Sequence, residues 1–185
     1  MGASPPMTLP KPLVLVGLMG AGKSAVGRRV AAKLKVPFID ADTEIEAAAG
    51  CSIAEIFARH GEPAFRDGER RVVSRLLETE PVHVLATGGG AFLDPATQAL
   101  IREKAISVWL RAELDVLFER VSRRSHRPLL KTADPKRTLA ELIEQRYPIY
   151  ARADIIVDSG DGPIGTMVDR VIAAVAAYLS KENAD

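Results

Sequence analysis

The chain has 185 residues, of which 47% are hydrophobic and 26% charged, an ordinary composition for one globular domain with an ample core. A formal net charge of +1 argues against a nucleic-acid surface, and an aromatic content of 5% argues against a base-stacking platform. No apolar run is long enough to cross a bilayer, and the single cysteine cannot form an internal disulfide. We therefore expect a cytoplasmic protein without a membrane partner, and the few aromatic residues favour a monomer.

The first segments predict a tail, a strand and a helix. Residues 1–11 are rich in proline and have little to bury, so we expect a flexible tail. Leu13–Val16 is apolar throughout, which predicts a buried parallel strand. Val26, Val30 and Leu34 then recur at helical spacing after a glycine-rich turn.

Strands and helices alternate along the rest of the chain. A capping box at Ser52–Glu55 opens a short helix that Gly61 could close, and Pro63 suits the first turn of the next one. The further predicted strands are residues 37–40, 82–86, 106–110 and 154–157. This alternation predicts an α/β fold of three layers, in which helices cover both faces of a five-stranded parallel sheet. We expect one domain over residues 12–180 and a C-terminal tail over 181–185.

Gly17–Ser24 matches the phosphate-binding pattern G-x-x-x-x-G-K-S, and it lies between a buried strand and a helix, as that pattern requires. Glycines let backbone N–H groups turn inward around a polyphosphate, and the helix N-terminus adds a favourable dipole. Lys23 would place its charge on the β- and γ-phosphates, and Ser24 would offer a hydroxyl to Mg²⁺. The alternative, a glycine-rich turn with an exposed lysine, does not explain the flanking strand and helix.

Asp40 and Asp42 follow the second predicted strand, at the sheet edge where open α/β folds bind ligands. If the segment is extended, alternation sends both carboxylates to the same side. One could organise water around Mg²⁺, and the other could receive a hydroxyl proton. Alternatively, the two acids cap a helix that follows.

Thr87–Gly90 ends the third predicted strand, and its three glycines expose backbone that a substrate can approach closely. Arg66 and Arg146 are candidates for bidentate carboxylate binding, although each taken singly could be a solvated arginine. Glu69 lies on the same helix face as Arg66 and could hold that arginine in place.

Basic residues crowd the segment from Arg120 to Lys131. A phosphate-binding loop alone does not define a kinase, but a compact domain with such a segment suggests a kinase with a mobile lid. An arginine on a closing lid would stabilise the negative charge of a transferring phosphate, and Arg127, held by Pro128, is the best candidate. The alternatives are a solvated basic loop or an RNA contact, and the net charge disfavours RNA.

From about Pro12 to the end, the order of these motifs resembles the shikimate kinase family. The pieces that carry the resemblance are Gly-x-x-Gly-x-Gly-Lys-Ser, Phe38–Asp42, Phe65-Arg66 with Glu69, Gly88–Gly90, Arg127–Leu130 and Arg146-x-Pro148-x-Tyr150. The resemblance implies a kinase that transfers phosphate from ATP to the 3-hydroxyl of shikimate, a step of chorismate and aromatic amino acid biosynthesis. It also implies a substrate-binding helical region at about 40–70 and a lid at about 120–135.

The resemblance assigns a role to each matching residue. The implied catalytic residues are Lys23, Asp42 and Arg127. The implied ATP site comprises Gly20, Ala21, Gly22, Lys23, Ser24, Ala25, Arg120 and Arg127, with Arg120 along the adenine. The implied shikimate site comprises Asp42, Phe57, Phe65, Arg66, Glu69, Gly88, Gly89, Gly90 and Arg146. Ser24 would bind Mg²⁺ directly, and Asp40 would act on it through water.

One feature departs from the family pattern. Family members often carry a basic or amide residue in the adenine loop after the last strand, and Ser159–Gly162 has none. Two other functions stay open: a related metabolite kinase such as a gluconate kinase, and a nucleotide-binding regulatory module without catalysis. The presence of Lys23, Ser24, Asp42 and Arg127 argues against the second.

Overall fold

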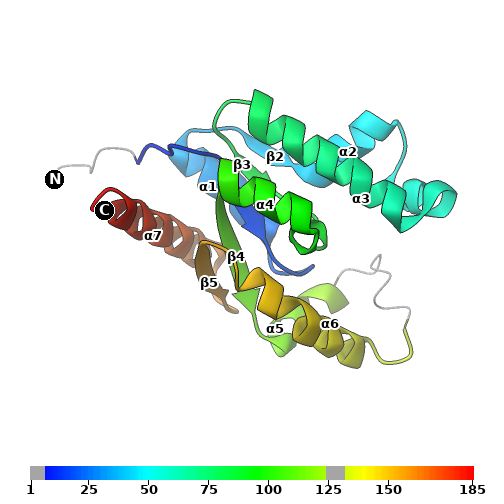
Figure 1. Ribbon diagram of the computed structural model, residues 1–185. Helices are drawn as coiled ribbons and strands as arrows, with labels where there is room; N and C mark the ends of the chain where they lie inside the picture. The colour runs from blue at the N-terminus through cyan, green and yellow to red at the C-terminus, as the bar shows by residue number, and fades with distance from the viewer. Residues whose placement is uncertain (1–6, 124–131) are drawn as a thin grey trace.

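A computed structural model describes residues 7–123 and 132–185 of the chain. Its five strands form one parallel sheet with the order β2-β3-β1-β4-β5, which confirms the predicted sheet (Figure 1). The strands are β1 (Leu13–Val16), β2 (Phe38–Asp40), β3 (Val84–Ala86), β4 (Ile106–Ala112) and β5 (Ile155–Ser159).

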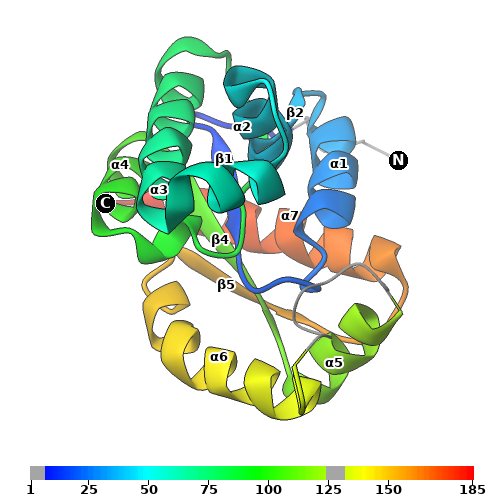
Figure 2. The ribbon, with the colours of Figure 1, turned by 90° about the vertical axis from the view of Figure 1, so that its right-hand side faces the viewer.

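Helices cover both faces of this sheet, in three layers. Figures 1 and 2 show α1 and α7 together on one face and α3 with α4 on the other, while α5 and α6 lie side by side near the ends of β4 and β5. The helices are α1 (Lys23–Leu34), α2 (Ala41–Ala49), α3 (Ile53–Thr79), α4 (Pro95–Lys104), α5 (Leu114–Ser122), α6 (Pro135–Tyr150) and α7 (Ile164–Glu182), with a short 3₁₀ turn η1 (Ala91–Leu93).

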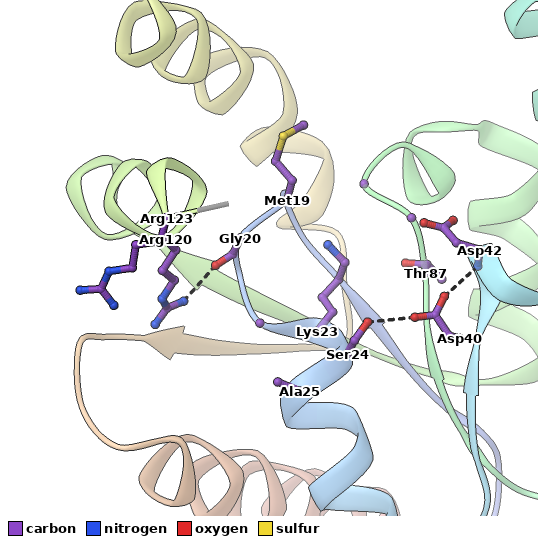
Figure 3. Close-up of a pocket in the computed structure, with 13 residues that line it drawn as sticks. Met19, Gly20, Lys23, Ser24, Ala25, Asp40, Asp42, Thr87, Arg120 and Arg123 are labelled. Atoms are coloured by element: carbon purple, nitrogen blue, oxygen red, sulfur yellow. Dashed lines mark hydrogen bonds between the residues drawn. The ribbon is translucent and has the colours of Figure 1, made fainter. Parts of the chain in front are cut away.

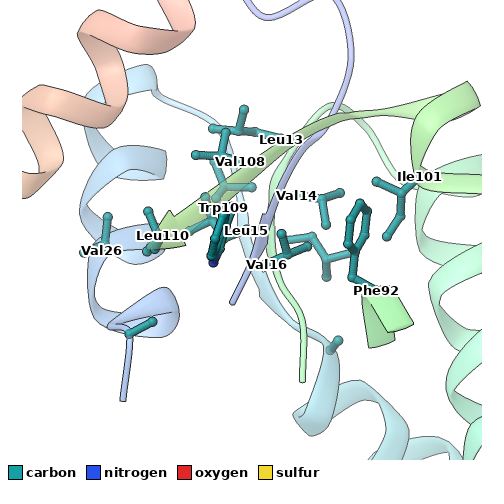
Figure 4. Close-up of a cluster of buried hydrophobic side chains, with 14 of the residues drawn as sticks. Leu13, Val14, Leu15, Val16, Val26, Phe92, Ile101, Val108, Trp109 and Leu110 are labelled. Atoms are coloured by element: carbon teal, nitrogen blue, oxygen red, sulfur yellow. The ribbon is translucent and has the colours of Figure 1, made fainter. Parts of the chain in front are cut away.

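The central strand β1 is completely buried, as its apolar sequence predicts. Figure 4 shows Val14 on the side of Phe92 and Ile101, whereas Leu15 lies toward the helix that carries Val26. Since side chains alternate along a strand, β1 joins the two halves of the core. Its carboxyl end leads directly into the glycine-rich loop.

The helix boundaries agree with the local signals at α3. The Ser52 hydroxyl accepts a hydrogen bond from the Glu55 amide (3.1 Å), as a capping box requires. Gly61 has a φ of 80° and breaks the helix, and Pro63 follows in the first turn of its second half. The predicted end at Gly61 and the predicted start at Pro63 are both confirmed.

One local prediction was wrong. Asp42 does not lie on an extended segment, because β2 ends at Asp40 and α2 begins at Ala41. The Asp40 carboxylate accepts hydrogen bonds from the amides of Asp42 (2.9 Å) and Thr43 (3.3 Å) and so caps the helix. The capping alternative therefore holds for Asp40, and helix geometry, not strand alternation, orients Asp42.

The ends of the domain also differ from expectation. Leu9 is buried against the core, although it lies within the segment expected to be a tail. Helix α7 continues to Glu182, two residues into the predicted C-terminal tail. Half of the predicted lid, residues 124–131, lies outside the described residues. None of the described helices is long and apolar enough to cross a membrane.

Candidate functional site

A cavity of about 340 Å³ opens at the carboxyl edge of the sheet, beside the glycine-rich loop. It brings together residues that are far apart in the sequence and come from β2, α1, α2, α5 and the loop after β3 (Figure 3). The residues that line it are Met19, Gly20, Gly22, Lys23, Ser24, Ala25, Asp40, Asp42, Thr87, Gly88, Gly89, Arg120 and Arg123. Many of the residues selected from the sequence thus meet in one place.

The glycine-rich loop forms one wall. Gly20 and Gly22 have φ values of 82° and 94°, a left-handed conformation that side chains disfavour, so glycine is needed at both turns. Lys23 donates from Nζ to the carbonyl oxygens of Gly17 (2.7 Å) and Leu18 (3.0 Å). The lysine charge is therefore held over the loop, at the N-terminus of α1. A helix N-terminus already favours a bound anion, so the lysine adds to the attraction for phosphate.

Ser24 and Asp40 form the floor of the cavity. The Ser24 hydroxyl donates to Oδ2 of Asp40 over 3.0 Å, as the dashed line in Figure 3 shows. Among the described residues, no group of three or more His, Cys, Asp or Glu side chains could hold a metal ion. Oxygen donors of this kind suit a hard cation such as Mg²⁺, which would complete its coordination with water and phosphate oxygens, as Mg²⁺ commonly does.

Asp42 lies across the cavity from the loop, in the first turn of α2. A side chain at Gly88 would place its Cβ only 3.0 Å from Oδ1 of Asp42 and 3.5 Å from Oε2 of Glu69. Glycine at this position thus lets the backbone after β3 pass close to two carboxylates. Glu69 is buried, its Oε1 accepts a hydrogen bond from Arg66 (2.8 Å), and its Oε2 has no hydrogen-bond partner within the described residues.

Burial and charge act in opposite directions on Glu69. Loss of solvent raises the pKa of its carboxyl group, while the hydrogen bond and charge of Arg66 lower it, and burial has the larger effect. The nearby charge of Asp42 raises the pKa further. The two carboxylates and Arg66 therefore form one electrostatic unit beside the cavity.

The predicted arginine pair faces Gly88–Gly90, the glycine loop after β3, which is distinct from the glycine-rich phosphate loop. A Cβ at Gly90 would lie 2.1 Å from Nη2 of Arg66, and a Cβ at Gly89 would lie 3.6 Å from Nη1 of Arg146. The guanidinium groups of α3 and α6 thus approach the same bare backbone from two helices. Two cations at one glycine-lined edge can bind a carboxylate.

Arg120 connects two loops that the sequence separates widely. Its guanidinium donates to the carbonyl oxygen of Gly20 (3.2 Å), to Oγ of Ser159 (3.1 Å) and to the carbonyl oxygen of Gly160 (2.6 Å). The glycine-rich loop and the loop after β5 are thereby joined through one side chain. The expected adenine contact of Arg120 stays a prediction.

Other selected residues lie elsewhere. Phe57 is exposed and its ring lies 4.7 Å from that of Phe65, and neither lines the cavity. Their proposed role as walls of the acceptor site stays untested, as does that of Arg127, which lies outside the described residues. Sequence reasoning did not select Thr87, whose hydroxyl donates to the Leu15 carbonyl (2.8 Å) and which lines the cavity. The signal that could have identified Thr87 as a site residue was its position directly before three glycines.

Comparisons with known proteins agree on one family. The family model described as shikimate kinase matches residues 19–176. A shikimate kinase from Rhodopseudomonas palustris is 60% identical over 169 residues, which cover 91% of this chain and 83% of the relative. The solved structure of shikimate kinase from Acinetobacter baumannii in complex with shikimate matches with a TM-score of 0.83 and 33% identity, over 90% of this chain and 93% of that one.

A solved gluconokinase from Sinorhizobium meliloti is a more distant match. It has a TM-score of 0.61 and 19% identity, over 94% of this chain and 96% of that one. At this identity the likeness shows a shared fold alone.

Proposed function

The chain belongs to the shikimate kinase family, and we propose that its cavity transfers the γ-phosphate of ATP to the 3-hydroxyl of shikimate. The products are shikimate 3-phosphate and ADP, and the reaction is a step of chorismate and aromatic amino acid biosynthesis. The observation that carries the residue assignments is the arrangement of Lys23 and Asp42, which line one cavity from opposite walls.

ATP binds along the glycine-rich loop in this proposal. The phosphates lie against the backbone amides of residues 20–25, and Lys23 exchanges its bonds to the Gly17 and Leu18 carbonyls for phosphate oxygens. Arg120 lies between this loop and the loop after β5, where the nucleoside would extend. Arg127 is proposed to neutralise the transferring phosphoryl group.

Shikimate occupies the opposite side. Arg66 and Arg146 bind its carboxylate, and the bare backbone of Gly88–Gly90 lets the ring approach closely. Asp42 accepts the proton of the 3-hydroxyl as that oxygen bonds to the γ-phosphorus and the bond to the β,γ-bridging oxygen breaks. Glu69 keeps Arg66 in place through their hydrogen bond.

Ser24 and Asp40 fit a magnesium site, because both offer oxygen donors beside the phosphate loop. We propose that Ser24 binds Mg²⁺ directly and that Asp40 contacts it through water. The ion supplies positive charge to the β- and γ-phosphate oxygens when it is bound. We also propose a cytoplasmic monomer that needs neither nucleic acid nor a membrane.

A coupled assay of ADP release tests this function. Purified protein with Mg²⁺ and ATP is supplied with shikimate, with gluconate or with no acceptor. We expect ADP release that depends on shikimate and a 1:1 yield of phosphorylated shikimate. Release that depends on gluconate would indicate a different metabolite kinase, and nucleotide binding without any turnover would indicate a regulatory module.

A further inference from the structure

Tyr150 is the last residue of α6, and neither the ATP site nor the acceptor site described above includes it. Its side chain is buried, with 1% of the residue exposed, and its hydroxyl donates a hydrogen bond to the carbonyl oxygen of Gly89. Gly89 is the central residue of the glycine loop and lines the cavity. A buried side chain on one helix thus holds the backbone of a substrate loop.

The same hydroxyl also lies close enough to Arg146 and Arg66 for both charges to act on it. Arg146 precedes Tyr150 by four residues, so both side chains lie on one face of α6. Burial raises the pKa of the Tyr150 hydroxyl, and the charge and hydrogen bond of Arg146 and the charge of Arg66 oppose this rise. The hydroxyl therefore lies where α6, its arginine and the glycine loop meet.

An aromatic cluster keeps the Tyr150 ring in this place. Its ring centroid lies 5.8 Å from that of Trp109 on β4 and 6.2 Å from that of Tyr147 on α6. Such contacts restrict the ring, so the hydroxyl has little freedom to leave Gly89. Trp109 thus supports the hydroxyl from the sheet side.

We propose that Tyr150 is a positioning residue for the acceptor: it sets the distance between the Arg146 guanidinium and the backbone of Gly89, so that carboxylate and ring are bound together. This inference rests on the proposed shikimate site. Tyr150 touches no reacting atom in this proposal, so its loss should weaken acceptor binding more than it slows transfer.

Tyr147 provides a matched control. Its hydroxyl also donates to a backbone carbonyl, that of Ala112 at the end of β4, and its ring also packs on Trp109. Ala112 does not line the cavity. Tyr150→Phe and Tyr147→Phe therefore each remove one hydroxyl and its hydrogen bond to a backbone carbonyl. Only Tyr150→Phe removes a hydrogen bond to the glycine loop. Phenylalanine keeps both rings, so we expect both variants to fold.

The experiment compares steady-state kinetics of the wild type and both variants. We expect Tyr150→Phe to raise KM for shikimate about five- to tenfold, as the loss of one hydrogen bond implies, with kcat and KM for ATP within about twofold of wild type. Tyr147→Phe should stay within about twofold in all three. The urea concentration at the midpoint of unfolding should fall by a similar amount in both variants.

A second comparison tests the link to Arg146. In an Arg146→Lys background, Tyr150→Phe should raise KM for shikimate less than about twofold, because the positioned guanidinium is already gone. Equal KM values for the two phenylalanine variants, a full effect in the lysine background, or an equal rise of KM for ATP would each overturn the inference. A wild type without turnover of shikimate would instead refute the proposed function.

Discussion

Asp42 is the single side chain on which the proposed proton transfer depends. It lies in the first turn of α2 and faces Gly88 and Glu69 across the strand end. Asn has nearly the same shape but cannot accept the hydroxyl proton. We expect Asp42→Asn to reduce kcat by about 10²- to 10⁴-fold, the usual contribution of a general base.

The matched control for this variant is Glu44→Gln, which changes another acid in the first turn of the same helix. The Glu44 carboxylate is half-exposed and pairs with Arg75 (3.4 Å), away from the cavity lining. Its turnover should equal that of the wild type. Thermal unfolding should show that both variants fold, and near-normal kcat in Asp42→Asn would remove Asp42 from the base role.

At the scale of elements, Asp94 links α3 to α4. Its carboxylate caps α4 through the Thr97 amide (3.0 Å) and accepts two hydrogen bonds from Arg70 on α3, each of 2.9 Å. These partners, Arg70 above all, hold the pKa of Asp94 well below its usual range. The pair anchors α3, which carries Arg66 and Glu69, beside the glycine loop.

Asp94→Asn keeps a good helix cap and removes the charge. We expect a loss of about 1 kcal/mol in the free energy of unfolding at pH 7, the upper range for a partly exposed pair. A depressed folded-state pKa stabilises the fold above the unfolded value, near 3.9, and that stabilisation is lost as the pH falls below it. The difference in unfolding free energy from wild type should therefore be constant above about pH 5 and narrow progressively below about pH 4, as the pH falls toward the depressed folded-state pKa.

Urea unfolding at several pH values measures this difference. Asp67→Asn is the control, because its side chain is 51% exposed and lies 3.6 Å from Arg70. Its effect should be below about 0.5 kcal/mol, as for most surface changes. A difference for Asp94→Asn that stays constant down to pH 3 would contradict the assignment of the stabilisation to charge.

At the scale of the whole molecule, a phosphate side and an acceptor side face each other across the cavity. The phosphate loop comes from β1 and α1, whereas the acceptor side combines α2, α3, the loop after β3 and α6. Each side of the cavity should therefore bind its ligand with its own side chains. Mg²⁺–ATP and shikimate should each raise the unfolding temperature. A ligand at a concentration of 100 times its dissociation constant adds about 2.7 kcal/mol to the free energy of unfolding.

Arg146→Ala tests this division. The variant should lose most of the stabilisation by shikimate and keep that by Mg²⁺–ATP, because Arg146 lies on the acceptor side. Arg137→Ala is the control on the same helix, with a side chain that is 78% exposed. Scanning calorimetry with each ligand would measure the shifts. Equal losses for both ligands would show that the two sides are not separate.

Features that depend only on neighbouring residues could be predicted from the sequence. The apolar run Leu13–Val16, the pattern Gly17–Ser24 and the break at Gly61 each depend on local geometry, and the structure confirms the strand and the break. The order of motifs also sufficed for the family. These features follow from short-range rules of burial, backbone freedom and capping.

Only the tertiary structure decided which distant groups meet. Nothing local places the Tyr150 hydroxyl on Gly89, or Arg120 between two loops that lie far apart in sequence. Even the orientation of Asp42 depended on whether the chain stays extended after Asp40 or begins a helix at Ala41. Such contacts arise because helices pack on a sheet edge through side chains that are remote in the chain, so their geometry emerges only when the core is complete.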